Sequence, residues 1–151
     1  MCPPKIDFGI VLDSSGSVGE ANFKKIKRFL MELVSYLNVG ESGSHVAMLH
    51  YDHFAYVDFL FSNKKLWSLT NLRSAIEQVK YTRGATYTQE ALKIAAKFFE
   101  IQQGCRKDEN SVQKVLLVIS DGETFGPKKE LEDASDLIKV KIIYYSLFSC
   151  I

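Results

Sequence analysis

Apolar residues follow two patterns along this chain, one typical of buried strands and the other of amphipathic helices. In short runs such as 6–12 and 114–120 nearly every residue is apolar, as in strands covered on both faces. In 20–37 the apolar residues instead recur every three or four positions, opposite a face of lysines and an arginine. The patterns together predict strands at 6–12, 44–52, 55–61, 114–120 and 141–148, and helices at 20–37, 66–79, 88–101 and 127–138.

Strands that alternate with helices predict an α/β fold with a doubly wound, mostly parallel sheet and helices on both faces. The 151 residues suit one core, and no linker or internal repeat divides them, so we expect a single domain over 1–151. Sheets of this kind bind ligands at the carboxyl ends of their strands. The loops that follow residues 12 and 120 are therefore the first places to look for a site.

Three loops expected at that edge carry oxygen-bearing side chains. They are 13–17 (Asp-Ser-Ser-Gly-Ser), 83–88 (Arg-Gly-Ala-Thr-Tyr-Thr) and 120–123 (Ser-Asp-Gly-Glu). Each alone is ordinary, because an Asp or Ser after a strand usually caps a helix or forms a turn. Together they offer a cluster of hard oxygen donors, which favour Mg²⁺, Mn²⁺ or Ca²⁺ over zinc or copper.

The chain resembles the von Willebrand factor A and integrin I domains over about residues 6–148. Residues 13–17 resemble that family's D-x-S-x-S motif, 84–88 its G-x-T-x-T loop, and 118–123 its strand end T/S-D-G-E, in the family's order. The resemblance implies a Rossmann-like A domain. It also implies that a metal-ion-dependent adhesion site is formed by Asp13, Ser15, Ser17, Thr86 and Asp121.

The resemblance further implies what such a site does. Family members hold a divalent cation, here Mg²⁺ or alternatively Mn²⁺ or Ca²⁺, and bind a Glu or Asp carboxylate of a partner protein through it. Two carboxylates leave a dication nearly neutral, and neutral hydroxyl ligands leave it able to accept that anionic group. We expect Tyr87 and Glu123 to contact the partner. The implied function is an adhesion or extracellular-matrix module that acts outside cells.

Catalytic alternatives lack their motifs. A phosphotransferase of the haloacid-dehalogenase type would need a second Asp where Ser15 stands, and Ser17 is not in a G-x-S-x-G turn. No phosphate-binding glycine loop is present, and no His lies beside the cluster in sequence to act as a base. We therefore expect no enzyme activity. The alternative to a matrix module is an intracellular A-type domain that scaffolds a multiprotein complex, which free cysteines would favour.

Charge and composition narrow the remaining classes. The net charge is +1 and the basic residues are dispersed, which argues against nucleic-acid binding. No apolar run approaches the roughly 18 residues of a membrane-spanning helix, and the first residues lack the apolar segment of a secretory signal. We expect ordinary strand or loop roles for three histidines, His45, His50 and His53. We expect sheet packing for four aromatic residues: Phe54, Tyr56, Phe59 and Phe61.

Three cysteines without a C-x-x-C pair are compatible with one disulfide plus a thiol or with three thiols. In the family's sheet order, Cys2 and Cys105 lie at the edge away from the metal and Cys150 lies at the metal edge. Because a strand of six residues spans roughly 20 Å and a disulfide needs Cα atoms within about 7 Å, we expect Cys2–Cys105 if any disulfide forms.

The family normally continues with a helix, a sixth strand and a C-terminal helix, and the sequence stops after the strand predicted at 141–148. The C-terminal helix is the lever of the integrin-type affinity switch, so we expect no such switching. An uncovered last strand also predicts lower stability or self-association through that strand.

Overall fold

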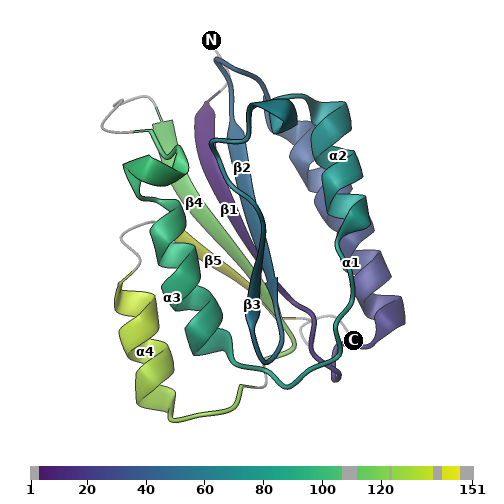
Figure 1. Ribbon diagram of the computed structural model, residues 1–151, viewed down its shortest axis with the longest axis vertical. Helices are drawn as coiled ribbons and strands as arrows, with labels where there is room; N and C mark the ends of the chain where they lie inside the picture. Colours follow the sequence, from purple (N-terminus) through teal and green to yellow (C-terminus); the bar gives the residue numbers. More distant parts are fainter. Residues whose placement is uncertain (1–3, 107–111, 123, 138–140, 147–151) are drawn as a thin grey trace.

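The computed structural model describes residues 4–106, 112–122, 124–137 and 141–146, the last range for its backbone alone. Five strands form one sheet between two layers of helices (Figure 1): β1 (Lys5–Asp13), β2 (His45–Tyr51), β3 (Ala55–Phe59), β4 (Val112–Ser120) and β5 (Lys141–Ser146). The strand order is β3-β2-β1-β4-β5, and every neighbouring pair is parallel except β2 with β3. The predicted doubly wound, mostly parallel α/β sheet is confirmed.

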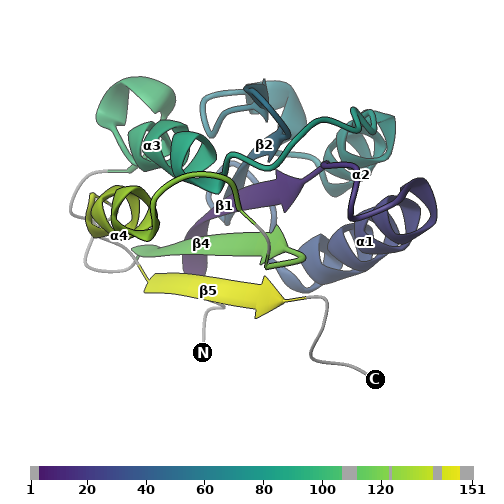
Figure 2. The same ribbon diagram turned by 90° about the horizontal axis from the view of Figure 1, so that it is seen from below.

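Helices cover both faces of the sheet. Figures 1 and 2 show α1 (Glu20–Leu33) and α2 (Leu69–Gln78) on one face, and α3 (Thr88–Phe98) and α4 (Lys128–Asp136) on the other. Because successive strand residues point to opposite faces, β1 contributes to both layers: Ile10 and Leu12 join the core under α1 and α2, and Val11 joins the core under α3. Among the described residues, no helix is both long and apolar enough to cross a membrane.

Several elements end earlier than the sequence pattern predicts. The helix predicted at 20–37 is α-helical only to Leu33 and continues as a 3₁₀ turn, η1 (Val34–Tyr36), where the Ser35 hydroxyl donates to the Met31 carbonyl. Such a bond competes with the helical pattern. Two further 3₁₀ turns, η2 (Lys64–Leu66) and η3 (Ile101–Gln103), precede α2 and follow α3. The strand predicted at 55–61 ends at Phe59, after a register shift opposite Met48 and Leu49.

The order of the strands fixes where a ligand can bind. From β1 the chain first builds β2 and β3 on one side and then crosses to β4 and β5 on the other, so the direction of winding reverses between β1 and β4. At such a switch point the connections leave in opposite directions and open a crevice beyond the carboxyl ends of the strands. In β1 and β4 these ends are Asp13 and Ser120. The carboxyl ends of the two strands lie at the bottom of the molecule in Figure 1.

Candidate functional site

In the loop after β1, the side chains become less buried along the chain. Asp13 is the last residue of β1 and is 1% exposed. The Ser15 backbone N–H donates to Asp13 Oδ1 at 2.8 Å, a turn that holds the carboxylate against its own loop. The Ser15 hydroxyl is buried and lies 3.1 Å from the hydroxyl of Ser17, which is exposed. One short segment therefore presents a carboxylate and two hydroxyls in succession toward the edge of the sheet.

The loop before α3 is hydrogen-bonded to this first loop along its backbone. Gly16 N–H donates to the Gly84 carbonyl at 3.0 Å, and Arg83 N–H donates to the Ser14 carbonyl at 3.0 Å. The Ser14 hydroxyl accepts from Thr82 N–H at 2.8 Å. Ser14 thus positions the second loop and, unlike its two serine neighbours, has no role in the predicted ligand set.

Gly84 is a glycine because of a close approach rather than its backbone angles. A Cβ at this position would lie 2.6 Å from the carboxylate of Asp52, in the turn between β2 and β3. Tyr87 N–H also donates to the Asp52 carbonyl at 3.1 Å. The β2–β3 turn and the second loop are therefore packed directly against each other.

The loop after β4 completes the cluster. The Ser120 hydroxyl donates to Asp13 Oδ2 at 3.1 Å, and Phe125 N–H donates to the Thr86 carbonyl at 2.8 Å. Asp121 and Thr86 are both buried. All three predicted loops therefore meet at the carboxyl edge of β1 and β4, with Asp121 near enough for its charge to act on Asp13.

Tyr51 is a site neighbour that the sequence argument did not include. It pairs with Asp13 in the parallel register of β1 and β2, and its hydroxyl lies 3.4 Å from Asp13 Oδ2 and 3.0 Å from the hydroxyl of Thr88. Burial, reinforced by the Asp13 charge, raises the pKa of Tyr51, so the phenol stays a neutral donor. Aligning the carboxyl ends of the two strands would have revealed it.

The electrostatic character of the site follows from these partners. Asp13 accepts hydrogen bonds from a backbone N–H and two hydroxyls, all of them neutral. Burial is the largest cause that raises the pKa of Asp13; the bonds from Ser15 oppose it, and the Asp121 charge raises the pKa further. Two acidic groups thus share a water-poor site beside neutral donors, an arrangement that favours a bound cation.

The donor chemistry fits a hard dication. The part of the chain that the structure describes contains no group of three or more His, Cys, Asp or Glu side chains placed to hold a metal. An ion here would therefore draw most of its ligands from hydroxyls and water, besides two carboxylates. Such all-oxygen sets suit Mg²⁺, Mn²⁺ or Ca²⁺.

The predicted partner-binding residues and cysteines lie only in part within the described residues. Tyr87 is half-buried between Thr86 and Thr88, whereas Glu123 and Cys2 lie outside the described residues. Cys105 is a buried thiol, and its neighbour Arg106 donates a hydrogen bond to Asp7 near the start of β1. Cys105 therefore lies at the edge of the sheet away from the candidate metal site, as predicted. Its pairing with Cys2 stays a prediction.

The predictions for the histidines and the aromatic residues are confirmed in part. His45 stacks on Trp67, and His50 contacts the Asp58 carboxylate at 3.0 Å, so both have strand roles. The prediction of sheet packing is confirmed for Phe59 and Phe61, which are buried. It is wrong for Phe54, which lies exposed in the turn between β2 and β3. Tyr56 is partly exposed but stacks on His50, its partner on β2, with 5.0 Å between ring centroids.

Comparisons with known proteins agree with this fold. A family model described as von Willebrand factor type A domain matches residues 7–148. The chain is 33% identical to cuticlin-6 of Caenorhabditis elegans over 86% of this chain and 21% of that protein. It is 29% identical to the human collagen alpha-6(VI) chain over 95% of this chain and 6% of that protein. It therefore spans only a small part of these relatives.

Solved structures show the same architecture. Proximal thread matrix protein 1 from the mussel byssus, in a structure whose description states a zinc-occupied MIDAS motif, superposes with a TM-score of 0.79 at 21% identity. That superposition covers 95% of this chain and 38% of the mussel chain. On the family match over residues 7–148, this chain belongs to the von Willebrand factor type A domain family.

Proposed function

We propose that this chain is a protein-binding module of the extracellular matrix that holds a divalent cation at the carboxyl edge of its sheet and binds an acidic side chain of a partner through that ion. The observation that carries the proposal is the pair of buried acids, Asp13 and Asp121, among neutral oxygen donors at the switch point of the sheet. The described hydrogen-bond donors to Asp13 are neutral, and a buried carboxylate in such surroundings favours a bound cation.

Five side chains would hold the ion: Asp13, Ser15, Ser17, Thr86 and Asp121. The bound ion supplies a concentrated positive charge that attracts an anionic oxygen. Two carboxylates neutralise a dication and hydroxyls add no charge, so this ligand set leaves the ion able to accept a further carboxylate. The exposed hydroxyl of Ser17 marks the side from which that partner group would approach.

Binding rather than catalysis suits the way the hydroxyls are used. Ser15 and Ser17 bond to each other rather than to a base. The nearest loop histidine, His53, uses Nδ1 to accept from Ala85 N–H at 3.2 Å. A nucleophilic serine would need a base within hydrogen-bond reach. The names of the relatives, a cuticlin, a collagen chain and a byssal matrix protein, support a location outside cells.

Calorimetric titration with Mg²⁺, Mn²⁺, Ca²⁺ and Zn²⁺ tests the metal site directly. We expect one ion per chain, and we expect Asp121→Asn to weaken Mg²⁺ binding by more than about tenfold because it removes one of the two charges. Asp133→Asn, on the exposed face of α4, is the matched control and should bind as the wild type does. Mg²⁺ binding that Asp121→Asn leaves unchanged would sink the proposal. So would binding of Zn²⁺ alone.

Partner binding provides the second arm of the test. A pull-down of matrix proteins performed with Mg²⁺ and then with excess EDTA should retain partners only with the metal. The Asp121→Asn protein should behave with Mg²⁺ as the wild type does with EDTA. Undiminished partner binding in EDTA would show that the ion does not mediate the contact.

A further inference from the structure

Five rings form a continuous strip that starts in the loops of the candidate metal site and crosses to the β2–β3 hairpin. Phe125 stacks on Tyr87 with 6.2 Å between ring centroids, and Tyr87 lies 5.1 Å from His53. His53 lies 6.1 Å from Phe54, which lies 6.5 Å from Tyr56. We call Phe125, Tyr87, His53, Phe54 and Tyr56 the aromatic strip.

The strip lies largely outside the core. Phe54 is 68% exposed, Phe125 59% and Tyr56 39%, although such side chains normally bury their area. A single exposed aromatic residue is common on protein surfaces and needs no explanation; Tyr36, 87% exposed at the end of η1, is such a case. A row of contiguous rings is different, because contiguous apolar surface marks a place where another molecule binds.

Backbone contacts fix the strip to the metal loops. Ala85 N–H donates to His53 Nδ1 at 3.2 Å, and the Asp52 carboxylate accepts from Phe54 N–H at 2.9 Å. Asp52 in turn accepts from Tyr87 N–H through its carbonyl at 3.1 Å. These contacts fix the backbone that carries the rings, and a surface whose backbone is fixed before binding loses less conformational entropy on contact.

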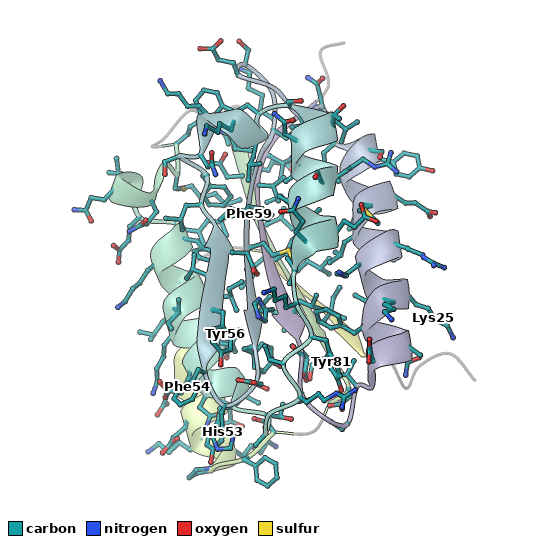
Figure 3. The ribbon with its side chains drawn as sticks, turned by 45° about the vertical axis from the view of Figure 1, so that its right-hand side comes forward. Lys25, His53, Phe54, Tyr56, Phe59 and Tyr81 are labelled. Atoms are coloured by element: carbon teal, nitrogen blue, oxygen red, sulfur yellow. The ribbon has the colours of Figure 1, made fainter. Side chains whose placement is uncertain are left out.

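The surroundings of the site are asymmetric. Toward α1, the exposed Arg83 pairs with Glu20 at 3.2 Å and lies over the ring of Tyr81, so that side is charged. Figure 3 shows His53 and Phe54 at the same end of the molecule as Tyr81, whose hydroxyl donates to the Ser15 carbonyl at 3.0 Å. On the hairpin side the exposed surface is formed by the rings of Phe54 and Tyr56, and His53 accepts a hydrogen bond from Ala85 N–H through Nδ1.

We infer that the aromatic strip selects the partner: the polypeptide whose carboxylate binds at the metal site carries an apolar side chain, aromatic or aliphatic, a few residues away, and that side chain packs on Phe54 and its neighbours. The inference rests on the proposed function and adds the chemistry of the partner to it. Tyr87 joins the two parts, since it follows Thr86 directly and contacts His53. An apolar neighbour buries its area against these exposed rings, whereas a small polar side chain such as Ser buries little apolar area there.

Synthetic peptides displayed on a surface test this inference. Each contains one Glu separated from one Phe by zero to four glycines, on either side, and each has a partner peptide with Ser in place of Phe. With Mg²⁺, the wild type should bind the best-spaced Phe peptide about tenfold more tightly than its Ser partner, the size expected for an interface aromatic. Phe54→Ser should reduce that preference to less than about twofold.

Tyr36→Ser is the matched control, because it removes an exposed ring outside the aromatic strip and should leave the tenfold preference intact. Equal binding of Phe and Ser peptides to the wild type, or an unchanged preference in Phe54→Ser, overturns the inference. If EDTA and Asp121→Asn still abolish binding in that case, the metal-site proposal stands alone. Peptide binding that survives EDTA overturns the proposed function and, with it, the inference.

Discussion

Strand β1 carries a buried aspartate near each end, and the fold treats the two in opposite ways. Asp7 is 0% exposed and is held by Arg106 through Nη2 at 2.6 Å and Nε at 3.0 Å, while Arg106 N–H donates to its second oxygen at 2.9 Å. Asp13 is 1% exposed, and among the described residues its hydrogen-bond donors are a backbone N–H and two hydroxyls. At one end the carboxylate is paired with a guanidinium, and at the other the described donors are neutral, as the proposed cation site requires.

The difference separates a structural clamp from a binding site. Arg106 also donates to the Gly43 carbonyl at 2.7 Å, so it joins the starts of β1 and β2 to the segment before β4. At the carboxyl end, burial and the charge of Asp121 raise the pKa of Asp13, so ionisation of Asp13 is costly unless a cation is bound as proposed. Substitutions at the two ends should therefore change different properties.

The largest expected effect follows the removal of the clamp. Asp7→Ala leaves the guanidinium of Arg106, whose side chain is 16% exposed, without its carboxylate. Breaking a buried pair from one side costs about 3–5 kcal/mol, because the remaining charge stays desolvated. Urea unfolding in EDTA, followed by circular dichroism, should show this loss. Asp133→Ala, on the surface of α4, should show almost none. A loss for Asp7→Ala no larger than for Asp133→Ala would mean that Asp7 is no clamp.

The two ends of β1 also differ in how much of their structure can be predicted from the sequence. Asp13 lies in a short motif after an apolar run, so its position at the carboxyl edge could be predicted from strand direction alone. Asp7 and Arg106 are 99 residues apart, and their contact depends on the pairing of β1 with β4, which no local pattern encodes. Tyr51 was missed for a similar reason, since its role depends on register between strands.

The hairpin shows another limit of pattern reasoning. Alternation of apolar and polar residues predicts on which face of a strand a side chain lies, but it does not predict whether other parts of the chain cover that face. Phe59 and Phe61 are buried as predicted, whereas Phe54, in the turn, and Tyr56, on the edge strand β3, stay exposed. Element type was therefore predictable from local sequence, and the exposure of an edge was not.

The clamp end also contains the cysteine for which a disulfide is predicted. Cys105 is buried beside Asp7, and burial, with the Asp7 charge, raises its thiol pKa to about 11. In protein produced under oxidising conditions we expect a Cys2–Cys105 bond that contributes about 2–4 kcal/mol to stability, measured as the difference between oxidised and reduced protein. Non-reducing peptide mapping identifies the pair. A Cys2–Cys150 link would contradict the predicted arrangement of the ends. Three thiols in protein purified from its natural source would favour the intracellular scaffolding alternative.

At the carboxyl end, Asp13→Asn should leave stability in EDTA within about 1 kcal/mol of wild type, since its partners are hydroxyls and an N–H that an amide can also satisfy. Mg²⁺ at about one hundred times its Kd should stabilise the wild type by about 2.7 kcal/mol and the variant hardly at all. Thermal unfolding with and without Mg²⁺ measures both. If Asp13→Asn destabilises the metal-free protein as much as Asp7→Ala does, the contrast between the two ends is wrong.

The smallest expected effect is a pH dependence at the clamp end. His45 is buried at the start of β2, stacked on Trp67 with 4.4 Å between centroids. Burial lowers the pKa of His45, the positive charge of Arg106 lowers it further, and the Glu41 carbonyl and Asp7 partly oppose both. Below the ordinary value of about 6.5 the unfolded chain therefore binds a proton that the folded chain resists, so stability is lost as pH falls.

His45→Gln removes this proton, so its unfolding free energy should depend less on pH than that of the wild type between about pH 7 and 5. The difference in slope cannot exceed about 1.4 kcal/mol per pH unit for one proton. Both proteins retain His50 and His53, so the contributions of these residues to the pH dependence cancel in the difference between the two proteins. The charge of Arg106 contributes to the lowered pKa of His45, so the Asp7–Arg106 pair should set part of that shift. Asp7→Ala removes a group that favours the protonated ring, and it should therefore steepen the loss of stability below about pH 6.5. A His45→Gln slope equal to that of the wild type would mean that His45 titrates alike in both states, and that the amino end of the sheet is less closed to water than its burial indicates.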